Sequence, residues 1–143
     1  MRKILAILAV IFFVAACKSN DNNDSEKNTA TVIDSAATTS IHWLDSTFID
    51  MGKIKKGSEV EVTFRFKNTG DKPLVIKDVK AGCGCTVPEK PTEPFSPGKE
   101  GTIKAKFNSV GQSLGEHMKN VTVYANTSPE PAFILHFRVE ITE

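Results

Sequence analysis

From Ile41 to the C-terminus, apolar and polar residues alternate along the chain in short runs. A period of two is typical of β-strands that have one buried and one solvated face. No run keeps the i, i+3, i+4 spacing of an amphipathic helix. Four strands are predicted clearly, at residues 59–67, 102–107, 120–125 and 133–142, and three weaker ones at residues 48–54, 74–80 and 85–88.

The phase of the alternation separates a predicted core from a predicted surface. Arg65 and Lys67 fall on the polar face of one strand and Lys104 and Lys106 on that of another, so we interpret them as solvated cations. His136 falls on the polar face of the last strand and is also expected to be solvated. The predicted core comprises Phe64, Phe66, Ile103, Phe107, Phe137 and Val139.

Turn-forming residues separate the runs. The segments 68–71 (Asn-Thr-Gly-Asp), 96–99 (Ser-Pro-Gly-Lys) and 128–131 (Ser-Pro-Glu-Pro) each contain Gly or Pro next to Asn, Ser or Asp. The Gly-rich segment 111–115 is expected to be a hairpin loop, because no helix follows that would make it a phosphate cradle. About seven short strands separated by such turns predict an all-β fold, an antiparallel β-sandwich of immunoglobulin-like architecture.

The N-terminus has the organisation of an export signal. Arg2 and Lys3 precede an apolar run at residues 4–13, which is too short to cross a bilayer as a helix. The following Val-Ala-Ala-Cys at 14–17 resembles the bacterial lipobox, in which the cysteine is lipidated and becomes the new N-terminus. We therefore expect residues 1–16 to be a lipoprotein signal peptide and Cys17 to carry the lipid. The alternative is an ordinary signal peptide that ends near a cysteine.

A polar segment separates the lipobox from the first strand. Residues 18–40 hold only two large aliphatic side chains, Val32 and Ile33, which is too little apolar surface to offset the entropy of ordering. We interpret residues 17–40 as the lipidated cysteine and a disordered tether, which would span about 25 Å as a random coil. Residues 41–143 then form one immunoglobulin-like domain.

Four motifs in this domain resemble a known family. Residues 48–54 (Phe-Ile-Asp-Met-Gly-Lys-Ile) are similar to its opening element, and residues 64–74 to its F-x-F-x-N-x-G-x-x-P-L hairpin. The Gly-Cys-Gly-Cys-Thr segment at 82–86 and the later Pro-Gly and Phe-Asn-Ser segments at 97–98 and 107–109 follow in the same order. The family is the bacterial domain of unknown function 1573 (DUF1573), common in exported proteins of Bacteroidota and related to Hydin and major-sperm-protein modules. The resemblance implies the fold and an envelope setting, but no reaction.

Cys83 and Cys85 are the only cluster of soft metal ligands, and they remain as a pair if Cys17 is lipidated. On an extended strand their Cα atoms would be about 6.7 Å apart, at the upper edge of disulfide geometry. Gly84 is expected to let the chain bend and bring the sulfurs together. Three interpretations stay open: small buried residues, as thiols or a disulfide, without chemistry; a metal site, most naturally for Cu(I); or a redox pair.

Other candidate chemistry is sparse. His42, His117 and His136 lie at no short metal-ligand spacing from one another, and no nucleophile elbow, zinc-protease motif or Walker loop is present. We therefore predict that the protein is not an enzyme. Ser35 and Ser46 each lie in an Asp-Ser-Ala or Asp-Ser-Thr triplet that resembles the O-glycosylation pattern of Bacteroidota.

These observations predict a lipid-anchored immunoglobulin-like module of the bacterial cell envelope with a binding or structural role. The alternative is an envelope protein that binds Cu or Zn through Cys83 and Cys85; otherwise no cofactor is expected. The expected partners are the membrane, through the lipid, and an envelope protein or glycan. The net charge of +1 gives no reason to expect nucleic acid. The residue after Cys17 is Lys18 and not Asp, which resembles a signal for sorting to the outer membrane. The domain would then lie on the periplasmic side of that membrane or at the cell surface.

Overall fold

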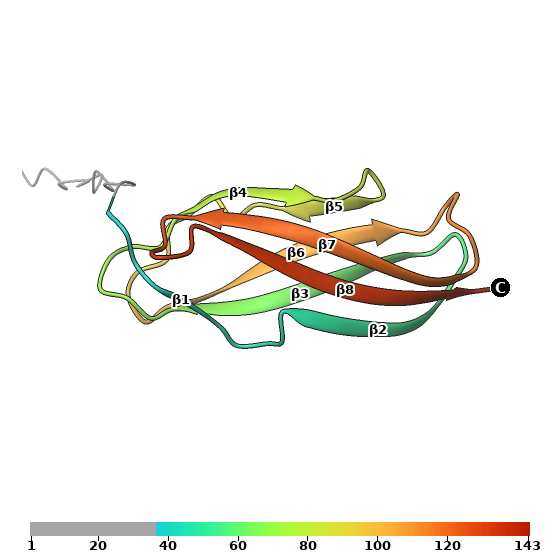
Figure 1. The fold of residues 1–143 in the computed structure, drawn as a ribbon, viewed down its shortest axis with the longest axis horizontal. Coiled ribbons are helices and arrows are strands. Elements are labelled where there is room, and N and C mark those ends of the chain that lie inside the picture. Colours follow the sequence, from blue (N-terminus) through green and yellow to red (C-terminus); the bar gives the residue numbers. More distant parts are fainter. Residues whose placement is uncertain (1–36) are drawn as a thin grey trace, which may run out of the picture. The chain divides into compact units, whose positions relative to one another are not determined.

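Eight β-strands form the structure, a computed structural model that describes residues 37–143 (Figure 1). The signal peptide, Cys17 and Ser35 lie outside the described residues. No helix in the described part of the chain is long and apolar enough to cross a membrane. The strands are β1 (Ile41–Trp43), β2 (Phe48–Lys55), β3 (Glu59–Asn68), β4 (Ile76–Ala81), β5 (Thr86–Glu89), β6 (Glu100–Asn108), β7 (Gly115–Ala125) and β8 (Ala132–Thr142).

The strands form two four-stranded sheets, with the orders β1-β3-β6-β5 and β2-β8-β7-β4. The all-β immunoglobulin-like fold predicted from the sequence is confirmed. Two details differ from the prediction. The strand β1 was not predicted, because three residues are too few to show an alternation. β2 runs parallel to β8, whereas every other pair is antiparallel, and a period of two is the same in both orientations.

The core lies between the two sheets and is dominated by the aromatic residues of β3, β6 and β8. All six predicted core residues are at most 1% exposed, so the predicted strand phases are correct. Phe66 is the centre of an aromatic cluster, with edge-to-face contacts to Trp43 and Phe95 at centroid distances of 5.7 and 4.9 Å. Phe107 and Phe137 make the corresponding contact between the sheets at 6.0 Å.

Two segments that the sequence suggested to be hairpins instead pass from one sheet to the other. The segment after β3 leads to β4, and the segment that contains Gly111 leads from β6 to β7. Gly, Pro and Asn favour both kinds of connection, so composition does not distinguish them. Asn68 holds the first crossing: its buried side-chain amide donates to the carbonyls of Lys72 (2.7 Å) and Phe95 (2.8 Å) and accepts from the amide of Gly70 (3.1 Å).

The folded domain begins before Ile41. Thr39 is 5% exposed; its amide donates to the carbonyl of Asn126 at 2.9 Å and its hydroxyl to Oδ1 of Asn68 at 3.0 Å. The side-chain amide of Asn126 donates to the carbonyl of Ala37 at 2.8 Å. Residues 37–40 have no large apolar side chain, so their packing through hydrogen bonds was not visible in the hydrophobic pattern.

Candidate functional site

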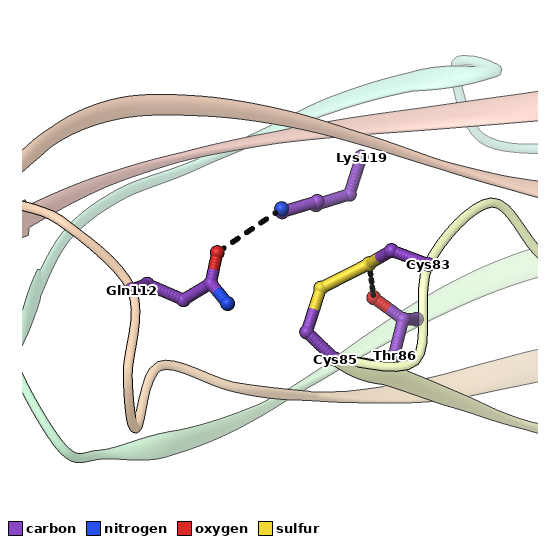
Figure 2. Close-up of a disulfide and its surroundings, with 5 residues drawn as sticks. All are labelled: Cys83, Cys85, Thr86, Gln112 and Lys119. Carbon is purple, nitrogen blue, oxygen red and sulfur yellow. Dashed lines mark hydrogen bonds between the residues drawn. A yellow bond between two sulfur atoms is a disulfide. The ribbon is translucent and has the colours of Figure 1, made fainter.

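Cys83 and Cys85 form a disulfide in the turn that joins β4 of one sheet to β5 of the other (Figure 2). Their Cα atoms are 5.4 Å apart, closer than the extended-strand spacing allows, because the cysteines lie in a turn and the strand begins only at Thr86. The bridge closes a loop of only three residues. By the chain-entropy relation such a loop contributes roughly 1.6 kcal/mol, compared with about 3 kcal/mol for a loop of 15 residues.

The sequence suggested a special role for Gly84 in this turn. In the structure, the glycine with a steric role is Gly82. A Cβ at Gly84 would meet nothing within 4 Å, and its φ lies outside the left-handed region. A Cβ at Gly82 would come within 2.6 Å of the side-chain oxygen of Asn120 in β7. The amide of Gly82 also donates to the carbonyl of Asn120 at 3.1 Å. The turn therefore approaches β7 most closely at Gly82, directly after β4 ends.

Backbone hydrogen bonds hold the turn to both sheets without help from the bridge. Besides the bond of Gly82 to β7, the carbonyl of Cys85 accepts from the amide of Asn108 at 2.9 Å, at the end of β6. Within the turn, the amide of Thr86 donates to the carbonyl of Cys83 at 3.3 Å. The positions of the two cysteines are thus determined by the surrounding sheets as well as by the disulfide.

The two sulfurs lie in different surroundings. Cys85 packs against the hydrophobic core, whereas the Sγ of Cys83 lies 3.7 Å from the buried hydroxyl of Thr86. Both cysteines are only partly exposed. Because a hydroxyl can donate to a thiolate, Thr86 provides a polar contact to one sulfur and not to the other.

A cation lies in the surroundings of this disulfide. Lys119 in β7 has the inward phase of Val121 and Val123, and its Nζ lies 5.5 Å from the ring centroid of Phe107. The same Nζ donates to Oε1 of Gln112 at 3.4 Å (Figure 2). Phe107 pairs with Thr86 in the β5–β6 ladder, so the lysine and the cysteine turn contact the same end of the core.

Lys119 was not predicted from the sequence to lie near the cysteines. The signal was present, since a lysine two residues before Val121 continues the buried face of the strand. The predicted strand began at residue 120, however, and the structure extends it to Gly115, which reveals the inward phase of Lys119.

The histidines do not join the cysteines. His42 lies exposed on β1, the Nε2 of His117 makes a hydrogen bond to the carbonyl of Ser113 at 2.8 Å, and His136 lies on the outer face of β8 as predicted. Within residues 37–143, no group of three or more His, Cys, Asp or Glu residues is arranged to hold a metal ion. A disulfide sulfur is not a thiolate ligand, so the metal interpretation would require prior reduction of the bridge.

The outer face of the β2-β8-β7-β4 sheet carries exposed apolar side chains in a diagonal line. Phe48 of β2 is opposite His136 of β8, and Ile134 is the next residue of β8 on the same face. Tyr124 of β7 is opposite Ala132 of β8. Each residue of the line is the diagonal neighbour of the next, within reach of large side chains. We call Phe48, Ile134 and Tyr124, which are 44%, 56% and 37% exposed, the outer patch.

Charged groups border the outer patch. Arg138 donates to Asp50 at 2.6 Å and to Glu116. The hydrogen bond from Arg138 lowers the pKa of the Glu116 carboxyl, while that of Asp50 is lowered first by the amide of Gly52 and further by Arg138. On the other side, the Nζ of Lys80 lies 5.4 Å from the ring centroid of Tyr124.

The strands of the β1-β3-β6-β5 sheet expose one large apolar side chain on their outer face, Val87 of β5, which is 62% exposed. The charges of this face pair across strands, as in Lys104 with Glu61 at 3.1 Å and Lys106 with Glu89 at 3.4 Å. Arg65 binds Asp45 at 2.7 Å, and its side-chain hydrogen bonds lower the pKa of the Asp45 carboxyl. The four predicted surface cations all alternate with buried residues, as the strand phase required.

The second candidate glycosylation serine, Ser46, lies exposed in the segment between β1 and β2. Its hydroxyl oxygen accepts a hydrogen bond from the amide of Phe48 at 3.1 Å, which accounts for a serine at this turn without any modification. Its modification stays a prediction.

An open pocket lies between the N-terminal segment of the domain and the loop between β7 and β8. Its lining is formed by short polar and apolar side chains, and Glu130 is its one titratable group, so the pocket holds no acid–base pair. The lining residues are Ser40, Ile41, Thr127, Ser128, Pro129, Glu130 and Phe133.

Two stacked sheets with these strand orders define an immunoglobulin-like β-sandwich, in which β1 belongs to one sheet and β2 to the other. The family model described as "Protein of unknown function (DUF1573)" matches residues 42–141. The chain therefore belongs to the DUF1573 family, as its motifs suggested.

Solved structures with the same fold come from distant proteins. A protein of unknown function from Porphyromonas gingivalis W83 has a TM-score of 0.64 and 16% identity, covering 76% of this chain and 50% of that one. The ASH/PapD-like domain 7 of human CEP192 has a TM-score of 0.53 and 10% identity, covering 74% and 86%. The secreted serine protease VesC from Vibrio cholerae has a TM-score of 0.51 and 11% identity, and the match covers 73% of this chain and 23% of that one.

At these identities the similarity shows the fold alone. This chain spans half the length of the Porphyromonas protein. No match was found among curated proteins.

Proposed function

We propose that this protein is a lipid-anchored module of the bacterial cell envelope that binds another envelope protein through the outer patch and has no catalytic activity. The observation that carries the proposal is the contrast between the two outer sheet faces. Both faces carry cross-strand ion pairs, but the strands of one face expose a single large apolar side chain, Val87, while the other presents Phe48, Ile134 and Tyr124 together to solvent. Contiguous exposed apolar side chains are typical of interaction sites.

The composition of the second face resembles that of a protein interface. An apolar centre that contains aromatic residues is bordered by Arg138 with its two carboxylate partners and by Lys80. Met118, which is 57% exposed, lies opposite Arg138 in the β7–β8 ladder and adds to the apolar area. Aliphatic side chains such as Ile134 favour a protein partner over a glycan, because sugars are bound mainly by aromatic stacking and polar groups.

The lipid anchor rests on the lipobox that ends at Cys17. A tether of about 20 residues between that cysteine and the first ordered contacts of the domain would allow the outer patch to turn toward neighbours in the same membrane. The lipid supplies location and the patch supplies recognition. Sorting to the outer membrane, suggested by Lys18, is part of the same proposal.

A photo-cross-linking amino acid at a single position tests the binding surface in the native cell. Replacement of Ile134 by p-benzoylphenylalanine is expected to give a discrete cross-linked adduct on illumination. The same replacement at Glu61, exposed on the opposite sheet, is the matched control and should give none. The adduct should also disappear when Phe48→Asp is added, since a charge would then occupy the patch. Equal adducts at positions 134 and 61 would contradict the proposed surface.

A further inference from the structure

We propose that the Cys83–Cys85 bridge is a reversible thiol–disulfide exchange site, which accepts two electrons from a dithiol of another protein while the domain stays folded. The inference does not depend on the outer patch or on the identity of the binding partner. It rests on the position of the bridge, on the hydrogen bonds that hold the turn, and on the groups around the two sulfurs.

The bridge ties together no distant parts of the chain. It joins residues two apart in one turn, so its opening releases little chain entropy and leaves the contact between the sheets intact. The hydrogen bonds from Gly82 to β7 and from Asn108 to Cys85 would keep the turn in place. A disulfide whose loss does not unfold the protein can be opened and closed in the native state.

The surroundings of the sulfurs favour exchange at neutral pH. Both cysteines are partly exposed, but Cys85 packs against the core, so we assign Cys83 as the sulfur that an incoming thiolate attacks. When the bond opens, the Cys85 sulfur leaves as a thiolate on the side where Figure 2 shows Lys119 and Gln112. A cation near a thiol favours its thiolate. The Thr86 hydroxyl then stabilises Cys83 when it is released in turn.

The exchange conserves atoms and electrons. A thiolate of the dithiol attacks Sγ of Cys83, the bond between Cys83 and Cys85 breaks, and a mixed disulfide forms with Cys83. The second thiolate of the dithiol then attacks the mixed disulfide and releases Cys83. The partner ends as a disulfide, and Cys83 and Cys85 have gained two electrons and, as neutral thiols, two protons. The reverse sequence re-forms the bridge, because the fold keeps the cysteines close.

A redox titration tests the exchange. Residues 17–143 carrying Cys17→Ser, so that Cys83 and Cys85 are the only thiols, are equilibrated with mixtures of reduced and oxidised glutathione without denaturant. Two glutathione molecules take the place of the dithiol. Alkylation and mass spectrometry should count zero thiols at the oxidising end and two at the reducing end, reversibly, with an unchanged circular dichroism spectrum. A bridge that opens only in denaturant, or a protein that unfolds on reduction, would overturn the proposal.

The role of the cation is tested by the rate at which Cys85 of the reduced protein reacts with iodoacetamide as a function of pH, with the alkylated residue assigned by mass spectrometry. Lys119→Gln should slow the reaction near neutral pH and move its pH profile upward. Lys104→Gln, on the outer face of the other sheet, is the control and should leave both unchanged. Identical profiles for the two variants would show that Lys119 does not favour the thiolate and would contradict this part of the mechanism.

Discussion

Gly101 of β6 lies directly opposite Phe66 of β3, and a Cβ added to Gly101 would come within 2.6 Å of Cζ of that ring. It would also collide with the ring of Phe95. Because both rings belong to the aromatic cluster, Gly101→Ala is expected to lower the free energy of unfolding by about 1–3 kcal/mol. Gly84→Ala is the matched control, since its Cβ meets open space. Chemical denaturation of both variants measures the difference, and equal stabilities would contradict the packing at Gly101.

Phe66 itself is fully buried, and its removal should have a larger effect. Phe66→Ala is expected to lower the free energy of unfolding by about 3–5 kcal/mol through lost burial and a residual cavity. Arg65→Ala, one residue away on the solvated face, removes an exposed ion pair and should change stability far less. Similar losses at the two positions in a urea titration would mean that the phase of β3 is wrong.

The pKa values of the two carboxyls beside the outer patch depend on Arg138. Arg138→Gln should raise the pKa of Glu116 clearly and that of Asp50 less, because the amide of Gly52 still binds Asp50. Carboxyl chemical shifts followed by NMR during a pH titration measure both values. Arg65→Gln should instead raise the pKa of Asp45 and leave Glu116 unchanged.

The same shifts give the sign of the stability change. A carboxyl whose pKa is lowered by folding stabilises the protein above its ordinary pKa, near 4, and this contribution is lost as the pH falls through the lowered value. Arg138→Gln should therefore reduce the amount by which the free energy of unfolding at pH 6 exceeds that at pH 2. An unchanged difference would mean that these hydrogen bonds do not persist in solution.

The lipid anchor is tested at Cys17. Cys17→Ser should leave the chain unprocessed by the lipoprotein signal peptidase and without label when cells are grown with a radioactive fatty acid. Labelling of the wild type is the positive control. Label retained at the wild-type level in the variant would refute lipidation at this cysteine.

Metal binding provides a separate test of the cysteine pair. We expect that a competing chelator removes both Cu(I) and Zn(II) from the reduced domain. Within residues 37–143, no His, Asp or Glu forms a group of three metal ligands with the two thiolates. Cys83→Ser and Cys85→Ser should then behave like the wild type in the titration. A one-to-one complex that survives in the wild type and is lost in both variants, and that weakens as the pH falls, would favour the copper alternative.

The sequence by itself determined which side of each strand is buried. Phe64 and Phe66 occupy alternate positions of one strand and Ile103 and Phe107 the same phase of another, and the hydrophobic effect buries such a face whichever strand lies beside it. The number and spacing of the strands predicted an immunoglobulin-like sandwich, and the family motifs implied the same fold. Neither source contained the parallel pairing of β2 with β8, since alternation does not depend on the direction of the neighbour.

Only the tertiary structure decided how residues far apart in the chain are combined. The cysteine turn, Asn108 and Lys119 belong to different strands or loops. They meet because β4, before the turn, pairs with β7, and β5, after it, pairs with β6. The outer patch likewise requires the register that aligns Phe48 with His136. Such contacts depend on strand order and register, which long-range packing selects and local alternation does not encode.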